Sequence, residues 1–127
     1  MEIITHQQID QTLCGKPLEV DDGCSRIELR LTAHMAADKT GLVHGGFVFG
    51  LADYAAMLTV NHPNVVLGAA DVKFLKPVKV GDTVVAHGAV QENQGKKQIV
   101  SVDVLKGKEK VFHGTFTCFV LERHVSG

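Results

Sequence analysis

The chain has 127 residues, of which 45% are apolar and 21% charged, and this composition fits one globular domain, residues 1–127, with enough apolar residues to form a core. Its formal net charge of −1 argues against a nucleic-acid partner. Residues 1–14 are polar and lack the apolar centre of a secretory signal peptide. The three cysteines are odd in number and have no Cys-x-x-Cys spacing, so we expect free thiols in a cytoplasmic protein.

The first segment of the chain predicts a short helix. Thr5 and Gln8 have the spacing of a capping box, in which two side chains satisfy the first amides of a helix. Gly15 followed by Pro17 is a typical stop signal. We therefore expect a helix that starts near Thr5 and ends before Gly15.

A strand pair is predicted next. Asp22-Gly23 has the composition of a tight turn between a short run, residues 18–20, and a longer run, residues 24–31. Apolar and charged side chains alternate strictly in the longer run, which is typical of a strand with one face in water. Its inward residues are Ile27, Leu29 and Leu31, and its outward residues are Arg26, Glu28 and Arg30.

Residues 47–61 predict one helix that is buried on nearly all sides. Helices of this kind lie in the interior of a protein or in a membrane, and this one is shorter than the roughly 20 apolar residues that a bilayer requires. We therefore expect a sheet to wrap round it, and no membrane partner. The side chains that cover its circumference are Phe47, Val48, Phe49, Leu51, Ala52, Tyr54, Ala55, Met57, Leu58, Thr59 and Val60.

Four strand candidates follow the helix, and short connections join them. Pro63 ends the helical pattern, and the connections are too short for crossover helices, so the sheet should be largely antiparallel. One buried helix and one sheet make an α+β domain. The four candidates are residues 65–75, 83–91, 97–105 and 110–121.

The segment His44-Gly45-Gly46 lies at the N-terminal end of the predicted helix. Amides there have no helical partner, and the helix dipole favours negative charge. Glycine allows a ligand to approach the backbone closely. A carbonyl oxygen that becomes an oxyanion during acyl transfer requires such donors, so this segment is a candidate oxyanion site.

Asp53 is the one ionisable residue in the middle of the predicted helix. A carboxylate buried without a partner is strongly unfavourable, so Asp53 must have partners, titrate at a raised pH or face a cavity. Two interpretations follow from the residue alone. Asp53 either takes part in catalysis or holds a subunit contact, because structural pairs also perturb pKa values.

Two separated motifs then occur in a familiar order. The first comprises Asp38, Gly41, His44-Gly45-Gly46 and Leu51-Ala52-Asp53, and the second is FLKPVKVGD at residues 74–82. Together they resemble the hotdog-fold acyl-CoA thioesterases, and among them the phenylacetate-pathway group, which has an HGG motif and an acid nine residues after its histidine. The resemblance covers nearly the whole chain from Leu18 onward.

This resemblance implies the hotdog fold, with one long buried helix wrapped by a largely antiparallel curved sheet of five to six strands. It implies hydrolysis of an acyl-CoA, or of a related acyl thioester, without a cofactor. Asp53 would be the nucleophile or the general base, and the Gly45 amide would polarise the thioester carbonyl. His44, the third candidate catalytic residue, either caps the turn or orients the loop through a ring hydrogen bond, and we expect orientation and not proton transfer. Similar proteins are homodimers whose sheets join edge to edge, often paired again into tetramers. Substrate contacts are expected from Gly46, Phe47, Asp38, Tyr54, Phe74, Lys73 and Lys76.

The sequence departs from the family pattern in two places. Relatives often have Asn or Gln six residues before the histidine, where this chain has Asp38, and an ionised carboxylate cannot donate a hydrogen bond. Relatives also often have a hydroxyl early in the strand after the helix, to orient the attacking water. Residues 67–69, Leu-Gly-Ala, offer none.

Several alternatives stay open. Lys73, Lys76 and Lys79 either form a solvated edge or attract the phosphates of coenzyme A. The histidines have no paired-ligand spacing, so no metal site is expected. Other functions compatible with the fold are a non-catalytic acyl-CoA-binding protein and a hydratase or dehydratase of acyl thioesters, although the HFP-type motif of the dehydratases is absent.

The spacing of the two candidate groups predicts a site shared between two chains. Gly45 and Asp53 are eight residues apart, so their backbones are separated by roughly 12 Å if the helix is continuous. Reacting groups must meet within about 3 to 3.5 Å. A two-fold axis with antiparallel helices would set Asp53 of one chain near Gly45 of the other.

Overall fold

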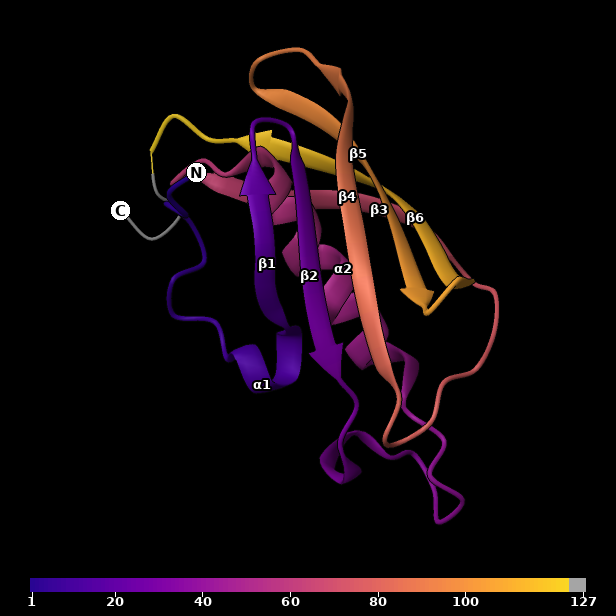
Figure 1. Ribbon diagram of the computed structural model, residues 1–127. Helices are drawn as coiled ribbons and strands as arrows, with labels where there is room; N and C mark the ends of the chain where they lie inside the picture. Colours follow the sequence, from indigo (N-terminus) through magenta and orange to yellow (C-terminus); the bar gives the residue numbers. More distant parts are fainter. Residues whose placement is uncertain (124–127) are drawn as a thin grey trace.

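The computed structural model describes residues 1–123 and consists of a curved sheet wrapped round one long helix (Figure 1). The long helix, α2, lies on the concave side of the sheet, and a short helix, α1, lies beside the first strand (Figure 1). The elements are α1 Gln11–Cys14, β1 Lys16–Asp21, β2 Cys24–Arg30, the 3-10 helix η1 Ala33–Met35, α2 Gly45–Val60, β3 Val65–Phe74, β4 Thr83–Asn93, β5 Lys97–Lys106 and β6 Glu109–Val120.

The six strands form one sheet in the order β1-β2-β4-β5-β6-β3, and every neighbouring pair is antiparallel. The predicted α+β class with a largely antiparallel sheet is therefore confirmed. The sheet order shows that β3 does not lie beside β4, its successor in the chain, but pairs with β6 at the far edge. β1 and β3 are the two edges of the sheet, and the connection between β3 and β4 spans the positions of β5 and β6.

α2 packs against all six strands and against α1, which confirms the expected burial on nearly all sides. It begins at Gly45, two residues earlier than predicted, and ends at Val60. Gly45 and Gly46 have no positive φ angle, so both adopt a helical backbone and extend the helix toward its cap, His44. Its buried residues are Val48, Leu51, Ala52, Tyr54, Ala55, Ala56, Met57, Leu58 and Thr59.

The predicted start of the first helix is wrong. α1 begins only after Asp10, whose carboxylate accepts hydrogen bonds from the amide and the hydroxyl of Thr12, 2.9 and 2.5 Å away. The hydroxyl of Thr5 instead lies 2.8 Å from His6 Nδ1 and is buried. A carboxylate directly before the helix is an efficient cap, and this cap prevails over the more distant capping-box pattern.

Hydrogen bonds hold the C-terminal half of α2 in place. Ser25 Oγ of β2 and Thr59 Oγ1 each lie within 2.9 Å of the carbonyl oxygen of Ala55. A Cβ atom at Gly88 of β4 would overlap the Thr59 hydroxyl, so this close approach requires glycine. At the end of the helix, Asn61 adopts a left-handed conformation, and its side chain bonds the backbone of Glu2 and Ile4. These contacts fix the axial position of α2 and thereby of its N-terminus.

Candidate functional site

The N-terminus of α2 presents free backbone donors. His44 is the cap residue, and its carbonyl accepts the amide of Phe47 at 3.1 Å. Among residues 1–123, no acceptor lies in hydrogen-bond geometry with the amides of Gly45 and Gly46. Because neither glycine has a positive φ, the backbone does not require glycine there. What glycine provides at these two positions is a free amide with no side chain beside it.

The approach to α2 is held by backbone contacts on both sides. The amide of His44 donates to the carbonyl of Met35 at 2.9 Å, and the amide of Val43 donates to Val78 at 3.0 Å. An isolated bridge also joins Leu42 to Lys79. The loop before the helix is thus fixed to the β3–β4 connection, and the direction of the Gly45 amide is fixed with it.

Asp38 stabilises the turn in this approach. One carboxylate oxygen accepts hydrogen bonds from the amide and hydroxyl of Thr40, at 2.9 and 2.7 Å, and from the amide of Leu42 at 3.3 Å. The hydroxyl of Thr40 is the main cause that lowers the pKa of Asp38 below its usual value. The carboxylate acts here as an acceptor, which an amide oxygen can also do, and its predicted contact with substrate stays a prediction.

An apolar cavity of about 290 Å³ opens beside Gly45. It lies between the N-terminus of α2, the approach loop and the segment that follows β3. Its lining is Leu42, Val43, Gly45, Val48, Phe74, Leu75, Lys76, Pro77, Val78 and Val111.

Asp53 lies in the middle of α2, half-buried. One of its carboxylate oxygens is buried and has no hydrogen-bond partner among residues 1–123. Burial raises the pKa of Asp53 to about 6. Four residues earlier, Phe49 packs its ring on Phe116 of β6, with centroids 5.8 Å apart, so this side of the helix faces β6. A carboxyl group without a partner is available to a water, a substrate or a second chain.

The cysteines nearest Asp53 are not activated. Burial, with a smaller contribution from the negative charge of Asp53, raises the pKa of Cys118 to about 12. The pKa of Cys14 is also raised, mainly by burial. Nucleophilic cysteines need a lowered pKa, so neither thiol is suited to attack a thioester.

The other predicted site residues are dispersed. The cavity brings Gly45, Phe74 and Lys76 together, whereas Tyr54 is 3% exposed and does not line it. Lys76 pairs with Glu109 of β6 at 2.9 Å. The cavity lining also lacks Phe47, Gly46 and Lys73. The ring of Phe47 contacts the ring of His44 edge-on, and the His44 ring lies 3.0 Å from the place that a Cβ atom on Gly46 would occupy. Lys73 of β3 stands opposite His113 of β6 in the sheet.

Sequence reasoning did not identify the valines of the cavity. Val43, Val48, Val78 and Val111 have the appearance of ordinary core residues. One signal was present for Val48, which follows Gly45 by three residues and so lies on the same side of the helix.

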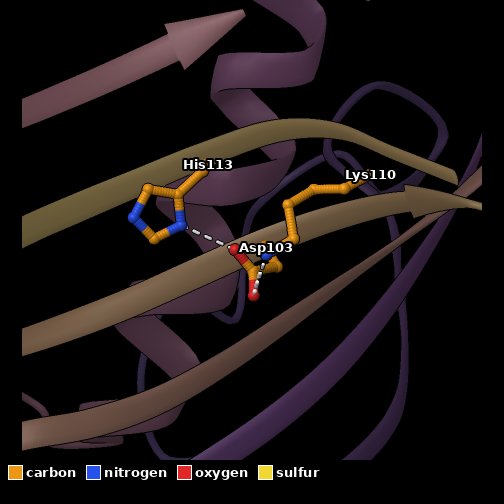
Figure 2. A network of polar contacts seen from close by, with 3 residues as sticks. All are labelled: Asp103, Lys110 and His113. Carbon is orange, nitrogen blue, oxygen red and sulfur yellow. Dashed lines mark hydrogen bonds and ion pairs between the residues drawn. The ribbon is translucent and has the colours of Figure 1, made fainter. Parts of the chain in front are cut away.

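A polar network was also missed, on the outer face of the sheet. Asp103 lies 2.6 Å from Nδ1 of His113 and 3.2 Å from Nζ of Lys110 (Figure 2). Burial acts to raise the pKa of Asp103, but these hydrogen bonds and charges together hold it below its usual value. Asp103 alternates with the buried Val102 and Val104, so it points away from α2. This network is therefore separate from the cavity.

Two further kinds of site are absent from the described chain. Within residues 1–123, no group of three or more His, Cys, Asp or Glu side chains is arranged to hold a metal ion. None of the helices in the same range has the length and apolar character needed to cross a membrane.

Comparison with known protein sequences gives partial matches to longer proteins. The chain is 54% identical over 123 residues to methylthioribose-1-phosphate isomerase of Aquifex aeolicus (strain VF5), which covers 96% of this chain but 27% of that protein. It is 34% identical over 91 residues to transcription factor FapR of Caldanaerobacter subterraneus subsp. tengcongensis, covering 72% of this chain and 46% of that protein. The chain thus spans less than half of either relative.

Solved structures match over most of their length. An uncharacterized protein from Pyrococcus horikoshii is 52% identical with a TM-score of 0.99, covering 100% of this chain and 98% of that one. A mutant of the phenylacetic acid degradation protein PaaI from Thermus thermophilus is 26% identical with a TM-score of 0.80, covering 87% and 96%. A Streptococcus mutans UA159 protein bound to acetyl-CoA is 23% identical with a TM-score of 0.81, covering 93% and 97%, and shows the shared fold.

The sequence pattern of the thioesterase superfamily matches residues 40–113, more than half of the chain. The matched segment contains the approach to α2, the whole of α2 and the strands up to the first part of β6. Together with one long helix inside a six-stranded antiparallel sheet, this match establishes the family and the fold: the chain belongs to the thioesterase superfamily and has the hotdog fold.

Proposed function

We propose that this protein hydrolyses an acyl-CoA to the free acid and coenzyme A. The observation that carries this proposal is the free amide of Gly45 beside an apolar cavity, with a second free amide at the next residue, Gly46. The amide of Gly45 donates a hydrogen bond to the thioester carbonyl and stabilises the oxyanion that forms when the carbonyl carbon is attacked. His44 orients the loop and does not transfer a proton.

Asp53 supplies the attacking group in this proposal. As general base it takes a proton from water while the water oxygen bonds to the carbonyl carbon; the C–S bond then breaks and the thiolate receives a proton. As nucleophile its carboxylate oxygen bonds to the carbonyl carbon, the C–S bond breaks, and the released thiolate receives a proton; water then hydrolyses the resulting acyl-enzyme anhydride to the free acid and the Asp53 carboxylate. A pKa of about 6 suits both roles, because the carboxyl group is mostly ionised at neutral pH yet is more basic than an exposed aspartate.

The proposed site is shared between two chains. α2 is continuous from Gly45 to Val60, so the two groups on one chain are separated by roughly 12 Å along the axis. The unpartnered oxygen of Asp53 supports a role for a second chain, because that oxygen lacks a partner within residues 1–123. Asp53 of one chain then acts on a thioester held at Gly45 of the other.

The free edge of β3 supports an edge-to-edge homodimer. β3 pairs with β6 on one side and, within residues 1–123, with no strand on the other. Two β3 strands related by a two-fold axis form an antiparallel pair. Such a pair continues the sheet and satisfies the free backbone groups of the edge. The dimer of dimers and the cytoplasmic location stay predictions.

The assignment of coenzyme A as the thiol carrier rests on the fold family. The Streptococcus mutans structure of the same fold holds acetyl-CoA. In this chain, Lys76 lies at the cavity and Lys73 lies three residues before it, both exposed, so each is a candidate contact for the phosphates of coenzyme A. Phe47, Gly46, Tyr54 and Asp38 stay candidate substrate contacts from the family resemblance.

A panel of acyl-CoA substrates tests the proposed function. Purified protein is given acetyl-, aryl- and long-chain acyl-CoAs, and the release of free thiol is followed in parallel for wild type and Asp53→Asn. We expect turnover of at least one substrate by the wild type and its loss in the variant. Absence of thiol release from every substrate, with binding of the same substrates measured by calorimetry, would overturn the hydrolase proposal.

That last outcome describes the second candidate function, a non-catalytic acyl-CoA-binding domain. The identity to part of a transcription factor favours it, because a domain of this family can serve in a protein that is not named as an enzyme. The unpartnered carboxylate of Asp53 favours hydrolysis, since burial of a carboxyl group without a partner is unfavourable and the binding of an acyl-CoA does not by itself require it.

A further inference from the structure

The cavity beside Gly45 has a closed floor and an open rim. Val43, Val48, Val78 and Val111 are between 2% and 6% exposed and form the floor. Phe74 and Leu75, at 54% and 48%, stand at the rim with Lys76 and Pro77. A ligand therefore enters past Phe74 and ends at the valines.

The lining identifies which part of a thioester fits this space. Apart from Lys76, every side chain that lines the cavity is a hydrocarbon. The pantetheine arm of coenzyme A carries two amide groups, and an amide buried without hydrogen bonds is strongly unfavourable. An acyl chain has no such groups. The chemistry of the lining therefore selects the acyl side of the thioester.

The volume sets an upper size. An apolar cavity of roughly 150 Å³ in another protein holds benzene, and this cavity has about 290 Å³. It has room for one aromatic ring with a short linker, or for a branched chain of similar bulk. The valines of the floor are β-branched and hold a fixed rotamer, so they do not move aside readily for a longer chain.

We propose that the acyl group of the substrate occupies the cavity between Gly45 and the valine floor, that this floor excludes long straight chains, and that Phe74 sets the width of the entrance. This inference rests on the proposed function, since it assigns the acyl side of the same thioester. With the carbonyl at the Gly45 amide, the acyl group points down to the floor and the sulfur points out past the rim.

Phe74 is well placed for this role. Its ring edge lies 3.1 Å from the position of a Cβ atom on Gly45, so it stands directly beside the amide that would hold the carbonyl. Its other side packs edge-on against Phe112, with ring centroids 5.1 Å apart. In the single chain the ring is held by one aromatic neighbour and is otherwise exposed, so its removal widens the entrance without opening the core. Phe74 is also the last residue of β3, the proposed dimer edge, so sedimentation has to show that Phe74→Ala keeps the assembly of the wild type.

Three variants test the assignment, and a fourth serves as the control for Phe74→Ala. Phe74→Ala widens the entrance, Val78→Ala deepens the floor and Val78→Leu raises it. Phe119→Ala is the control for loss of an exposed aromatic ring, because Phe119 lies on β6 over Gly68 and does not line the cavity. Thermal unfolding and sedimentation of each variant establish that the fold and assembly persist.

The first readout is kcat/KM across straight-chain acyl-CoAs of increasing length and one aryl-CoA. We expect the kcat/KM of the wild type to fall steeply once the acyl group is larger than one aromatic ring with a short linker. Val78→Ala should raise the long-to-short ratio of kcat/KM by about 10- to 200-fold, the range found for one methylene in an apolar pocket. Phe74→Ala should raise kcat/KM for the aryl-CoA relative to a straight-chain acyl-CoA of similar length. Val78→Leu should shift the preference to shorter groups, and Phe119→Ala should leave the profile unchanged.

The second readout is calorimetric binding of non-hydrolysable acyl-CoA thioethers and of free coenzyme A. An unchanged length profile in the Val78 variants, together with an unchanged aryl-to-straight-chain ratio in Phe74→Ala, would overturn the acyl assignment while leaving hydrolysis intact. Equal weakening of every ligand, free coenzyme A included, would assign the cavity to the pantetheine arm instead. Thioether binding that follows the predicted size limit without any hydrolysis would overturn the proposed function and retain the acyl site.

Discussion

Gly45 and Asp53 occupy the first and ninth positions of one uninterrupted helix, α2, and this places a free amide and an unpartnered carboxyl group on the same rigid element. Their backbones are roughly 12 Å apart. The cavity includes the first residue and not the second. Because of this separation, a substitution at Gly45 or at Asp53 changes one group and leaves the other in place, so the two roles can be tested independently.

The rate of hydrolysis should depend on pH through Asp53. Burial raises its pKa to about 6, and the ionised form is the one that attacks or accepts a proton. We expect kcat/KM to rise as the pH increases through about 6 and then to level off. The measurement is a pH–rate profile under conditions where the chain stays folded. A limb near roughly 4, the value of an exposed aspartate, would show that substrate-free Asp53 is solvated in the working enzyme.

Asp53→Asn should lose activity and gain stability at neutral and higher pH. The amide cannot act as base, so kcat should fall by roughly 10² to 10⁴. The folded pKa of Asp53 lies above its unfolded value, so the folded chain binds more protons between about pH 4 and 6, and the stability of the wild type decreases with pH across this window. Above the window the wild type carries the full unfavourable effect of a buried charge, which asparagine does not have.

Urea unfolding of both proteins near pH 8 and near pH 4 measures this difference in stability. The advantage of Asp53→Asn should be present at the higher pH and should shrink at the lower one, where the wild-type carboxyl group is largely protonated in the folded state. A variant less stable than wild type at both values would give Asp53 a structural partner and remove the argument for its freedom.

Gly45→Ala and Gly50→Ala form a matched pair on the same helix. Both replace glycine by alanine at a backbone without positive φ, and Gly50→Ala, in the interior of the helix, should gain up to about 1 kcal/mol of helix stability. A Cβ atom at Gly50 meets nothing within 4 Å, whereas one at Gly45 stands in the cavity, 3.1 Å from the ring of Phe74. Alanine keeps the amide, but its methyl group obstructs the approach of the carbonyl, so we expect kcat to fall by up to about 10² to 10³ for Gly45→Ala, the effect of losing one oxyanion donor. Equal activity in the two variants would contradict an oxyanion role for Gly45.

Much of the fold could be predicted from local patterns. The alternation around Ile27 predicted β2, and the all-round apolar surface of α2 predicted burial inside a sheet, because both patterns record burial directly. The helix ends were less accurate. The sequence placed the start at Phe47, since glycine has low helix propensity, while tertiary contacts of the approach loop start α2 at Gly45.

The parts that escaped prediction depend on which strand lies beside which. The position of β3 at the far edge follows from pairing with β6, and no local pattern encodes it. The register of β5 against β6 likewise brings Asp103 to His113 (Figure 2). The sequence predicts that both Tyr54 and Val48 are buried, but it does not show that only Val48 lines the cavity. A single helix pattern shows that a face is covered but does not identify the neighbour that covers it.

A mixture of two inactive variants should recover activity, and this is the sharpest test of the shared site. Gly45→Val obstructs the amide, and Asp53→Asn removes the attacking group. If Asp53 acts on a thioester bound at Gly45 of the other chain, each mixed dimer contains one site with both lesions and one with neither. Activity should therefore approach half of the wild-type value per mixed dimer. Subunit exchange is verified with two affinity tags of different mass, and each variant alone serves as the baseline. Verified mixed dimers that stay inactive would place both groups of one site on a single chain, and the roughly 12 Å along α2 would then have to be closed by a bend that the continuous helix does not show.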